Sequence, residues 1–544
     1  MRQKMIKEDK KWSDPQVAPP KISHDVKYKS REDKGYVNKV LLLNPPTDRT
    51  QFVGSDNYFP LGLLMLATIL KKDDDIVELI DLNNEFFTRQ LNKDLFTEHM
   101  EKVVLPYIEE FKPDMIGLGG TFSGAFKYTK IISAIIKNKF PHIPTAVGGN
   151  HASTFKGMII ERFRSIDYVM IGEAEHTFPE LLKSVVHNNG EGLDKIDGLS
   201  YRKGGHLESP YDSSLEKTHT PRKDIVVQNK YYYITNLDDV PTADFDLVGV
   251  AKYYMDTKDW YNPHNIKIGQ PFPIISSRSC PMRCTFCNMW HVHGPEIRYR
   301  SADNVVDEIE YLYNKYDARY FQFMDDNFTF DKKRVIRIMS EINRRNLKIS
   351  YDTPNGIAIS KLDADVIKAM VDGGLIRISL AIESGSEEIR NKMMKGLKQR
   401  KIYDIAKEFQ KYPHVFVKAF FIVGMPEETH ETLEATRDMI KTLPLHKFSI
   451  NYATPFPGTA LFNQCKSKDL LKYDVVDYVE IDNHQLRSDR PHFKPFELTE
   501  EDLMDFVAWG DEYLSTLSHK TGKEDPRGAG DINDAKKNVL ISDY

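Results

Sequence analysis

Two successive series of short apolar runs, with helical stretches between them, constrain the fold of this chain more than any other feature. The first series has apolar runs at 39–46, 76–81, 115–119, 144–149 and 168–172. Short buried strands that alternate with helices predict a doubly wound parallel sheet. Ligands bind to such sheets at the carboxyl ends of the strands. In this chain those ends carry Thr121, Ser123, Gly148, Gly149, Asn150, His151, Gly172 and Glu173, which are our candidate binding residues.

The second series predicts a different α/β domain. Its strand-like runs are 273–277, 320–324, 348–352, 376–382, 415–423 and 447–452, with helical runs at 303–316, 332–345 and 364–371. Six such units predict a partial (β/α)6 barrel, short of the eight units of a TIM barrel. We therefore expect an α/β protein with a charged disordered tail (1–37), a Rossmann-like domain (38–190), a connector (191–270), the partial barrel (271–465), a C-terminal helical region with a helix at 498–517 (466–522), and a loose tail (523–544).

Composition excludes several classes of protein. A net charge of -5 argues against a nucleic-acid partner, because phosphate binding requires a basic surface. No apolar run approaches the roughly 20 residues of a membrane-spanning helix. The first 34 residues are rich in Lys and Asp and lack the apolar region of a secretory signal. We therefore expect a cytoplasmic protein without an integral membrane segment.

Three of the four cysteines lie within eight residues and directly follow the first strand of the second series: Cys280, Cys284 and Cys287. Four cysteines in 544 residues are too few for a disulfide scaffold, and such clustering indicates metal ligation. Cysteine thiolates hold iron–sulfur clusters, and three ligands leave one iron of a four-iron cluster open. A zinc site is the alternative, with His291 or His293 as the fourth ligand. The remaining cysteine, Cys465, is expected to be a buried inert thiol.

Residues 273–465 resemble the radical S-adenosylmethionine superfamily, on the motif C-x3-C-x2-C with the aromatic Phe286 before its third cysteine. The resemblance implies that the open iron binds the amino and carboxylate groups of S-adenosylmethionine, which an electron then cleaves to a 5′-deoxyadenosyl radical. It also implies cofactor contacts from successive strand ends: Asp325 and Asp326 near the methionine, Glu383 and Ser384 near the ribose and carboxylate, and Gly424 near the adenine. Each carboxylate alone is equally explained by a helix N-cap or a solvated loop.

The first domain resembles the cobalamin-binding domain that precedes the barrel in many enzymes of this type. The resemblance rests on the stretches 60–63, 147–152 and 172–175, and it implies that the candidate residues of the first sheet contact cobalamin. Many cobalamin domains carry D-x-H-x-x-G, whose histidine binds cobalt, but residues 38–185 contain no such run. This departure implies a cobalt without a histidine ligand from the protein. The alternative for His151 is then a capped or solvated loop histidine.

The resemblance implies a cobalamin-dependent radical methyltransferase that acts on an unactivated carbon of a small-molecule, lipid or peptide substrate. Its cofactors would be a 4Fe–4S cluster, S-adenosylmethionine and cobalamin, and its electron donor a protein such as flavodoxin or ferredoxin. A first alternative is a ring-forming enzyme like the anaerobic cyclase of chlorophyll synthesis, because similar domain pairs occur there. A second alternative is a cobalamin or iron–sulfur sensor without turnover.

Overall fold

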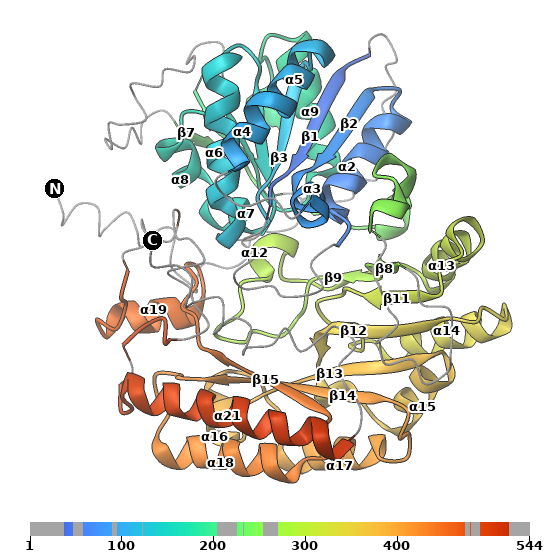
Figure 1. The fold of residues 1–544 in the computed structure, drawn as a ribbon, viewed down its shortest axis with the longest axis vertical. Coiled ribbons are helices and arrows are strands. Elements are labelled where there is room, and N and C mark those ends of the chain that lie inside the picture. Colours follow the sequence, from blue (N-terminus) through green and yellow to red (C-terminus); the bar gives the residue numbers. More distant parts are fainter. Residues whose placement is uncertain are drawn as a thin grey trace.

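A computed structural model describes residues 37–46, 58–89, 95–121, 123–203, 226–231, 233–253, 270–473, 479, 490–494 and 496–521. The tails predicted at 1–37 and 523–544 lie outside these residues, apart from Val37. The described part contains two α/β domains, drawn one above the other in Figure 1. No helix in this part is long and apolar enough to cross a membrane.

The first sheet has seven strands in the order β2-β1-β3-β4-β5-β6-β7. The first five strands are parallel, and β6 and β7 continue the sheet in antiparallel fashion. This order confirms the doubly wound sheet. The strands β6 and β7 fall inside the predicted connector, so the sheet extends beyond the boundary expected at residue 190. The bounds are β1 (Lys39–Asn44), β2 (Ile76–Asp81), β3 (Met115–Gly119), β4 (Thr145–Gly148), β5 (Tyr168–Met170), β6 (Leu199–Arg202) and β7 (Val226–Gln228).

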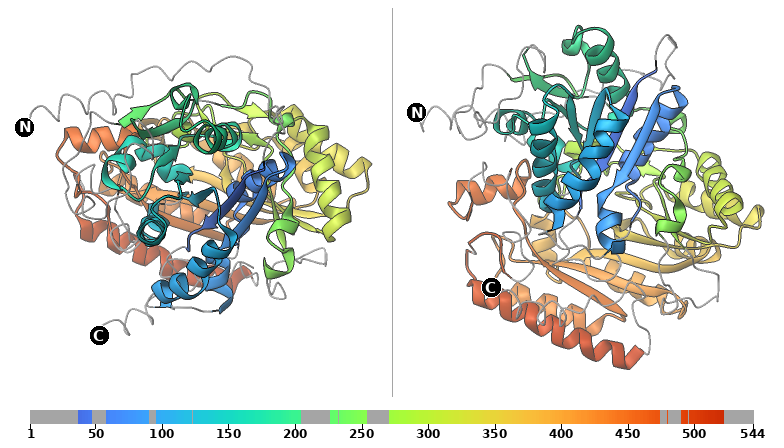
Figure 2. Two further views of the ribbon diagram at one scale, coloured as in Figure 1. Left: turned by 90° about the horizontal axis from the view of Figure 1, so that it is seen from above. Right: turned by 45° about the horizontal axis from the view of Figure 1, so that its top comes forward.

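Helices cover both faces of the first sheet, as Figure 2 shows. Side chains of a strand alternate between the faces, so Val40 and Leu42 of β1 pack on one side and Leu41 and Leu43 on the other. The first face holds α2 (Leu61–Lys72) and α9 (Ala174–His187). The second holds α3 (Leu82–Arg89), α4 (Leu95–His99), α5 (Leu105–Phe111), α6 (Ser123–Lys139), α7 (Asn150–Phe155) and α8 (Gly157–Arg162), with a π-helical turn, η2 (Met100–Val104), between α4 and α5.

The second sheet has six parallel strands in the sequential order β8-β11-β12-β13-β14-β15. The six predicted βα units are therefore confirmed, and β8 and β15 are the two edges of an open sheet. How far the sheet curves into a barrel stays a prediction. The bounds are β8 (Pro271–Ile274), α13 (Ala302–Tyr316), β11 (Tyr320–Phe323), α14 (Lys332–Arg344), β12 (Ser350–Ile357), α15 (Ala364–Asp372), β13 (Leu375–Glu383), α16 (Glu387–Lys392), α17 (Gln399–Phe409), β14 (Phe416–Val423), α18 (His430–Thr442) and β15 (Lys447–Tyr452).

The strand expected at 273–277 is divided in two. The first part, β8, ends at Ile274, and β9 (Ser277–Arg278) turns away to pair with β10 (Arg298–Tyr299) in an antiparallel ladder. The break occurs because the Ser276 carbonyl accepts hydrogen bonds from the Arg300 backbone and the Arg334 side chain instead of continuing the sheet. Residues 277–299, named the cysteine loop below, therefore leave the sheet. They contain the three clustered cysteines and the short helix α12 (Trp290–His293).

Segments outside the two sheets join the domains. The described part of the connector forms four 3-10 turns, η3 (Leu193–Lys195), η5 (Leu237–Asp239), η6 (Phe245–Leu247) and η7 (Val250–Tyr253). Phe245 packs against Phe272 in the core of the second domain. Beyond the second sheet lie α19 (Ala460–Ser467) and α21 (Glu500–Thr521), which confirms the helix expected at 498–517. Phe462 of α19 and Val479 pack into the second-face core of the first domain. The chain thus returns to its first domain after completing the second.

Candidate active site

The cysteine loop is fixed just before its first thiol. Ser279 adopts a left-handed backbone conformation (φ 72°), which is uncommon for a residue with a side chain. Its N–H donates to Asp326 over 2.9 Å, and its hydroxyl donates to the carbonyl of Gly294 on the returning half of the loop. Further along, the Cys287 N–H donates to the Cys284 carbonyl over 3.1 Å. These contacts bring both ends of the loop together at the carboxyl edge of the second sheet.

The thiols themselves are half-buried and lie close enough to influence one another. Burial raises the pKa of Cys284, which the nearby ammonium of Lys395 opposes, and burial raises the pKa of Cys287 to about 12. Metal binding must therefore displace protons from these thiols. The amide of Asn327 donates to the Cys280 sulfur over 3.3 Å. A cation and an amide donor beside three thiolates fit a cluster with a negative charge.

Within the described residues, no three His, Cys, Asp or Glu side chains converge closely enough to hold a single metal ion. This finding covers the three cysteines as well as the histidines, so it does not decide between zinc and a cluster. His293 directs its Nδ1 to Glu173 at 3.4 Å, and the side chain of His291 lies outside the described residues. The donor set favours a cluster, in which each cysteine binds a different iron.

The two aspartates that follow β11 support the start of the cysteine loop. Asp325 is buried and accepts hydrogen bonds from the Ser276 hydroxyl (2.7 Å) and from the Ser277 hydroxyl. Asp326 accepts from the N–H of Ser279. Burial is the main cause that raises the pKa of both carboxyls. Their predicted contacts with the methionine of the cofactor stay a prediction.

The end of β13 presents an ion pair near the cysteines. Glu383 has a left-handed backbone (φ 73°), and its carboxylate accepts from Lys395 over 2.7 Å. Both side chains are about nine-tenths buried. Our sequence analysis did not single out Lys395, because it lies in a loop without a recognisable motif. Ser384 is fully buried, and its hydroxyl accepts from the backbone of Ser386.

The end of β14 is held by a buried carboxylate. Gly424 has a positive φ of 86°, and an added Cβ would lie 3.0 Å from a methyl group of Leu503. The N–H groups of Gly424 and Met425 both donate to one oxygen of Glu428. Gly424 therefore has a structural requirement of its own, and its predicted contact with adenine stays a prediction.

A cavity of about 260 Å³ opens beside these groups at the carboxyl ends of β13, β14 and β15. Aromatic and aliphatic side chains form most of its wall, and Glu383 and Asn451 add polar groups. Such a wall is typical of sites that hold a small organic molecule. The lining residues are Phe286, Glu383, Phe420, Ile422, Asn451, Tyr452, Ala453, Thr454 and Phe456.

The candidates of the first domain gather at the carboxyl edge of its parallel strands. Thr121 after β3 is exposed, and Asn150, the first residue of α7, is partly exposed. Gly149 has a φ of 122°, and an added Cβ would lie 2.7 Å from the backbone of Gly120. Only glycine lets these two loops approach so closely. The edge thus combines exposed polar groups with tightly packed loops, which fits a large ligand at this place.

The other residues of this edge have mixed positions. Gly148 ends β4, where an added Cβ would meet Met170 at 3.4 Å. The N–H of Gly172 (φ 77°) donates to the Ser153 hydroxyl over 2.9 Å. Ser123 begins α6, and its side chain lies outside the described residues. The cobalamin contacts predicted for these residues stay predictions.

His151 lies inside the core of the first domain. Its ring is 2% exposed and stacks on Phe126, with the ring centroids 4.1 Å apart, and the Phe155 ring centroid is 4.5 Å away. Burial lowers the pKa of His151 to about 3, against a hydrogen bond to the backbone of Val479. His151 is therefore not a solvated loop histidine, and it lies in the first turn of α7.

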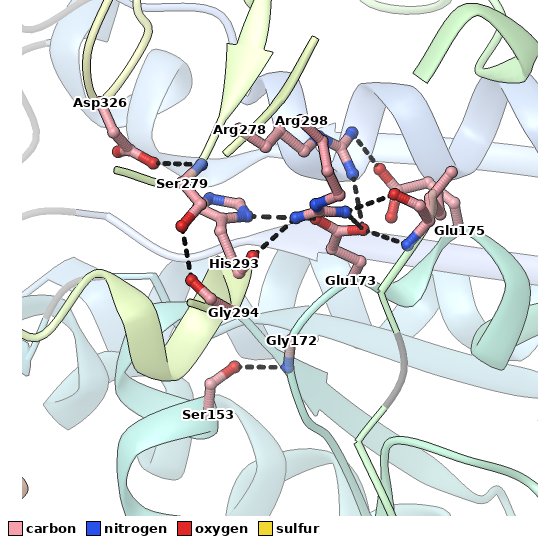
Figure 3. Close-up of polar contacts among 11 residues, drawn as sticks. Ser153, Gly172, Glu173, Glu175, Arg278, Ser279, His293, Gly294, Arg298 and Asp326 are labelled. Carbon is pink, nitrogen blue, oxygen red and sulfur yellow. Dashed lines mark hydrogen bonds and ion pairs between the residues drawn. The ribbon is translucent and has the colours of Figure 1, made fainter. Parts of the chain in front are cut away.

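Glu173, at the end of β5, is the most heavily bonded of the candidate residues (Figure 3). Arg298 binds it with both nitrogens of its fork, at 2.7 and 2.9 Å, and Arg278 lies 3.4 Å away. The backbone N–H of Ile234 donates to it over 2.8 Å. Burial alone would raise the pKa of Glu173, but the guanidinium groups of Arg278 and Arg298 hold it well below its usual range. Both oxygens of Glu173 are already engaged with the cysteine loop. Its contact with cobalamin stays a prediction.

Comparison with known proteins assigns each domain to a family. Residues 274–440 match the family model described as the Radical SAM superfamily, and residues 54–182 match the one described as the B12 binding domain. A protein of Pyrococcus horikoshii described as an uncharacterized methyltransferase is 31% identical over 453 residues, which cover 81% of this chain and 88% of that protein. An anaerobic magnesium-protoporphyrin IX monomethyl ester cyclase of Cereibacter sphaeroides is 24% identical, over 74% of this chain and 59% of that protein.

Among solved structures, the chain is similar to the radical S-adenosylmethionine methyltransferase TsrM from Kitasatospora setae, solved with cobalamin and a 4Fe–4S cluster bound. The TM-score is 0.60 at 18% identity, and the match covers 80% of this chain and 75% of that chain. At this identity the likeness establishes the fold alone.

Proposed function

The chain belongs to the radical S-adenosylmethionine enzymes that carry a B12-binding domain, and from this premise we propose that it methylates an unactivated carbon of its substrate. Its cofactors are a 4Fe–4S cluster, S-adenosylmethionine and cobalamin. One observation carries the proposal. The cysteine loop leaves the second sheet and contacts the carboxyl edge of the first through α12 and the carboxylate of Glu173, which would bring the two proposed cofactor sites to one domain boundary (Figures 1 and 3).

The residues at this boundary have distinct tasks. The cluster and S-adenosylmethionine supply a radical that removes hydrogen, and cobalamin supplies the methyl group. Cys280, Cys284 and Cys287 would hold the cluster, and the ammonium of Lys395 offsets negative charge beside them. The cavity walled by Phe286 and Phe420 would receive an organic molecule and keep water away from the radical. Of the candidate residues of the first sheet, Thr121, Gly149 and Asn150 would hold cobalamin.

The finer features of the reaction belong to the proposal as well. We infer a small-molecule, lipid or peptide substrate. We also infer a low-potential electron donor, such as flavodoxin or ferredoxin, because the cluster must be reduced before it can cleave S-adenosylmethionine. A cytoplasmic location is consistent with such a donor and with four unpaired cysteines. The similarity to a cyclase supports ring formation as the second candidate function.

An experiment without substrate tests the proposal. Anaerobically reconstituted protein is reduced and given S-adenosylmethionine labelled in its methyl group, with cobalamin present or omitted. A methyltransferase must reload cobalamin, so label should appear in methylcobalamin together with an equal amount of S-adenosylhomocysteine. Without cobalamin, the protein should still cleave S-adenosylmethionine slowly to 5′-deoxyadenosine.

Each outcome of this experiment separates the candidate functions. Cleavage to 5′-deoxyadenosine that requires cobalamin, without any methylcobalamin, would replace methylation with the cyclase-like reaction. No cleavage under strong reduction would favour a sensor. Once the substrate is known, product mass decides between a gained methyl group and a lost pair of hydrogens, and a methylated product formed at full rate without cobalamin would refute the proposal.

A further inference from the structure

We propose that Glu173 is a positioning residue that clamps the cysteine loop to the first domain, and so fixes the distance between the cluster and cobalamin. The inference rests on the proposed function, because a fixed distance matters only if both cofactors act on one substrate. The position of Glu173 after a strand predicted a cofactor contact, but its carboxylate binds the cysteine loop and the connector.

Both base strands of the cysteine loop reach the same carboxylate. Arg278 comes from β9 and Arg298 from β10, and these strands pair directly, with Arg278 opposite Arg298. Arg298 binds Glu173 through two nearly parallel hydrogen bonds, which define its orientation as well as its distance. Glu175, two residues after Glu173, accepts a hydrogen bond from the other terminal nitrogen of Arg278. The first domain therefore binds the cysteine loop at both of its base strands, β9 and β10.

The remaining contacts close the network. Ile234 of the connector donates its N–H to Glu173 and accepts from Arg298 through its carbonyl. The carbonyl of His293, at the end of α12, accepts from Arg298 over 2.6 Å. Below the guanidinium lies the ring of Tyr233, at 5.4 Å from its centroid. Four segments, from the first domain, the connector and both halves of the cysteine loop, thus meet at one buried carboxylate (Figure 3).

The grip lies close to the thiols along the chain. Arg278 precedes Cys280 by a single intervening residue, Ser279, whose backbone is itself held by Asp326. On the returning side, the Ser279 hydroxyl reaches the Gly294 carbonyl, next to His293. A displacement of Glu173 would therefore also displace the cysteines, because so few residues separate them from the arginines that it binds. Reactions between two bound groups lose rate steeply when their separation changes by about 1 Å.

Removing the charge of Glu173 should loosen this contact without removing its shape. Glutamine has nearly the same volume, but its amide cannot neutralise Arg298, which binds no other carboxylate among the described residues, whereas Arg278 keeps its ion pair with Glu175. An uncompensated buried charge is strongly unfavourable, so Arg298 should withdraw toward solvent and release the returning half of the loop. We expect a loss of order that is confined to the domain boundary, because the packing of both domain cores involves other residues.

The test compares Glu173→Gln with two other variants in the full-length, reconstituted protein. Glu180→Gln is the matched control, since Glu180 is an exposed carboxylate on α9, the helix that begins directly after Glu173. Arg298→Lys is the second test variant. It keeps the positive charge and replaces the fork with a single ammonium, so it should give an intermediate effect even if Glu173→Gln folds poorly.

Two measurements read the clamp without an activity assay. Hydrogen exchange should become at least about tenfold faster in the cysteine loop of Glu173→Gln, and remain unchanged in β3 and β13. Pulsed electron paramagnetic resonance measures the distance between cobalt(II) and the reduced cluster. The wild type and Glu180→Gln should give one narrow distribution, and Glu173→Gln a broad one.

The outcomes distinguish the clamp from the proposed function. Unchanged exchange and an equally narrow distance distribution in Glu173→Gln would overturn the clamp. Equal acceleration of exchange in β3 and β13 would show a general loss of stability and would also overturn it. Absence of a cobalt signal in the wild type would instead overturn the proposed function, while the exchange data would still decide whether the clamp exists.

Discussion

Replacement of Glu428 by glutamine should make the protein more resistant to alkaline pH. This carboxyl is 1% exposed, and its Oε1 meets no donor in the part of the chain that the structure describes. Burial raises its pKa from the ordinary 4.5 to about 7, against the two backbone N–H groups of Gly424 and Met425. Folding therefore favours the protonated form, and ionisation of the folded protein is costly.

The size of the effect follows from linkage between proton binding and folding. The folded-state pKa is raised, so the stabilisation is complete below pH 4.5 and is lost as the pH rises through 7. At about 1.4 kcal/mol per pKa unit, the full loss is about 3 kcal/mol. Glu428→Gln cannot ionise and escapes this loss. About 2.5 kcal/mol of this loss falls between pH 5 and pH 8. Over this range the melting temperature of the variant should therefore rise relative to wild type by roughly 5–10 °C, taking about 2–4 °C per kcal/mol for a domain of this size.

Thermal melting of wild type, Glu428→Gln and the exposed control Glu431→Gln across this pH range measures the effect. Comparison at each pH cancels the contribution of every other titrating group. The absolute difference at low pH depends on how well the amide is accommodated, so only its change with pH is diagnostic. A melting-temperature difference between Glu428→Gln and wild type that stays constant from pH 5 to pH 8 would refute the reasoning.

Two further predictions concern the cofactors. Alanine at Cys284, or at either of the other two clustered cysteines, should abolish the cluster and all cleavage of S-adenosylmethionine. Cys465→Ala should spare both, because Cys465 is fully buried among apolar side chains. Iron content and 5′-deoxyadenosine formation measure these effects, and full activity in Cys284→Ala would contradict the ligand assignment. His151→Ala should retain cobalamin, because the His151 ring packs against Phe126 and Phe155 inside the first domain. The cobalt(II) electron paramagnetic resonance spectrum tests this. Nitrogen hyperfine splitting that disappears in the variant would show instead that His151 binds cobalt.

The strands and the position of the cysteine motif were predictable from the sequence for a simple reason. Buried parallel strands are short, continuous apolar runs, and the runs at 39–46 and 415–423 stand out between helical stretches. The strand β7 and the membership of β6 in the first sheet were missed, because these strands are only three and four residues long and lie at an antiparallel edge. Such short segments carry too little periodicity to be distinguished from a connector.

The partners of the candidate residues were not predictable. A strand end indicates which edge of a sheet a side chain occupies, but it does not indicate what the side chain meets there. Glu173 and Arg298 lie 125 positions apart, and neither has a local motif that marks an ion pair between domains. Lys395 and Glu383 are close in sequence, yet their pairing depends on the left-handed backbone at the end of β13. Apolar periodicity carries no information about such contacts.

The return of the chain to its first domain has a consequence for protein synthesis. The face of the first sheet that holds α6 and α7 is completed by Phe462 and Val479, and Val479 also bonds to the buried ring of His151. A ribosome makes these residues after the entire second domain. The first domain to emerge therefore exposes part of its apolar core until translation has passed the second domain, and its protection during that interval must come from chaperones or from a provisional packing of the same surface.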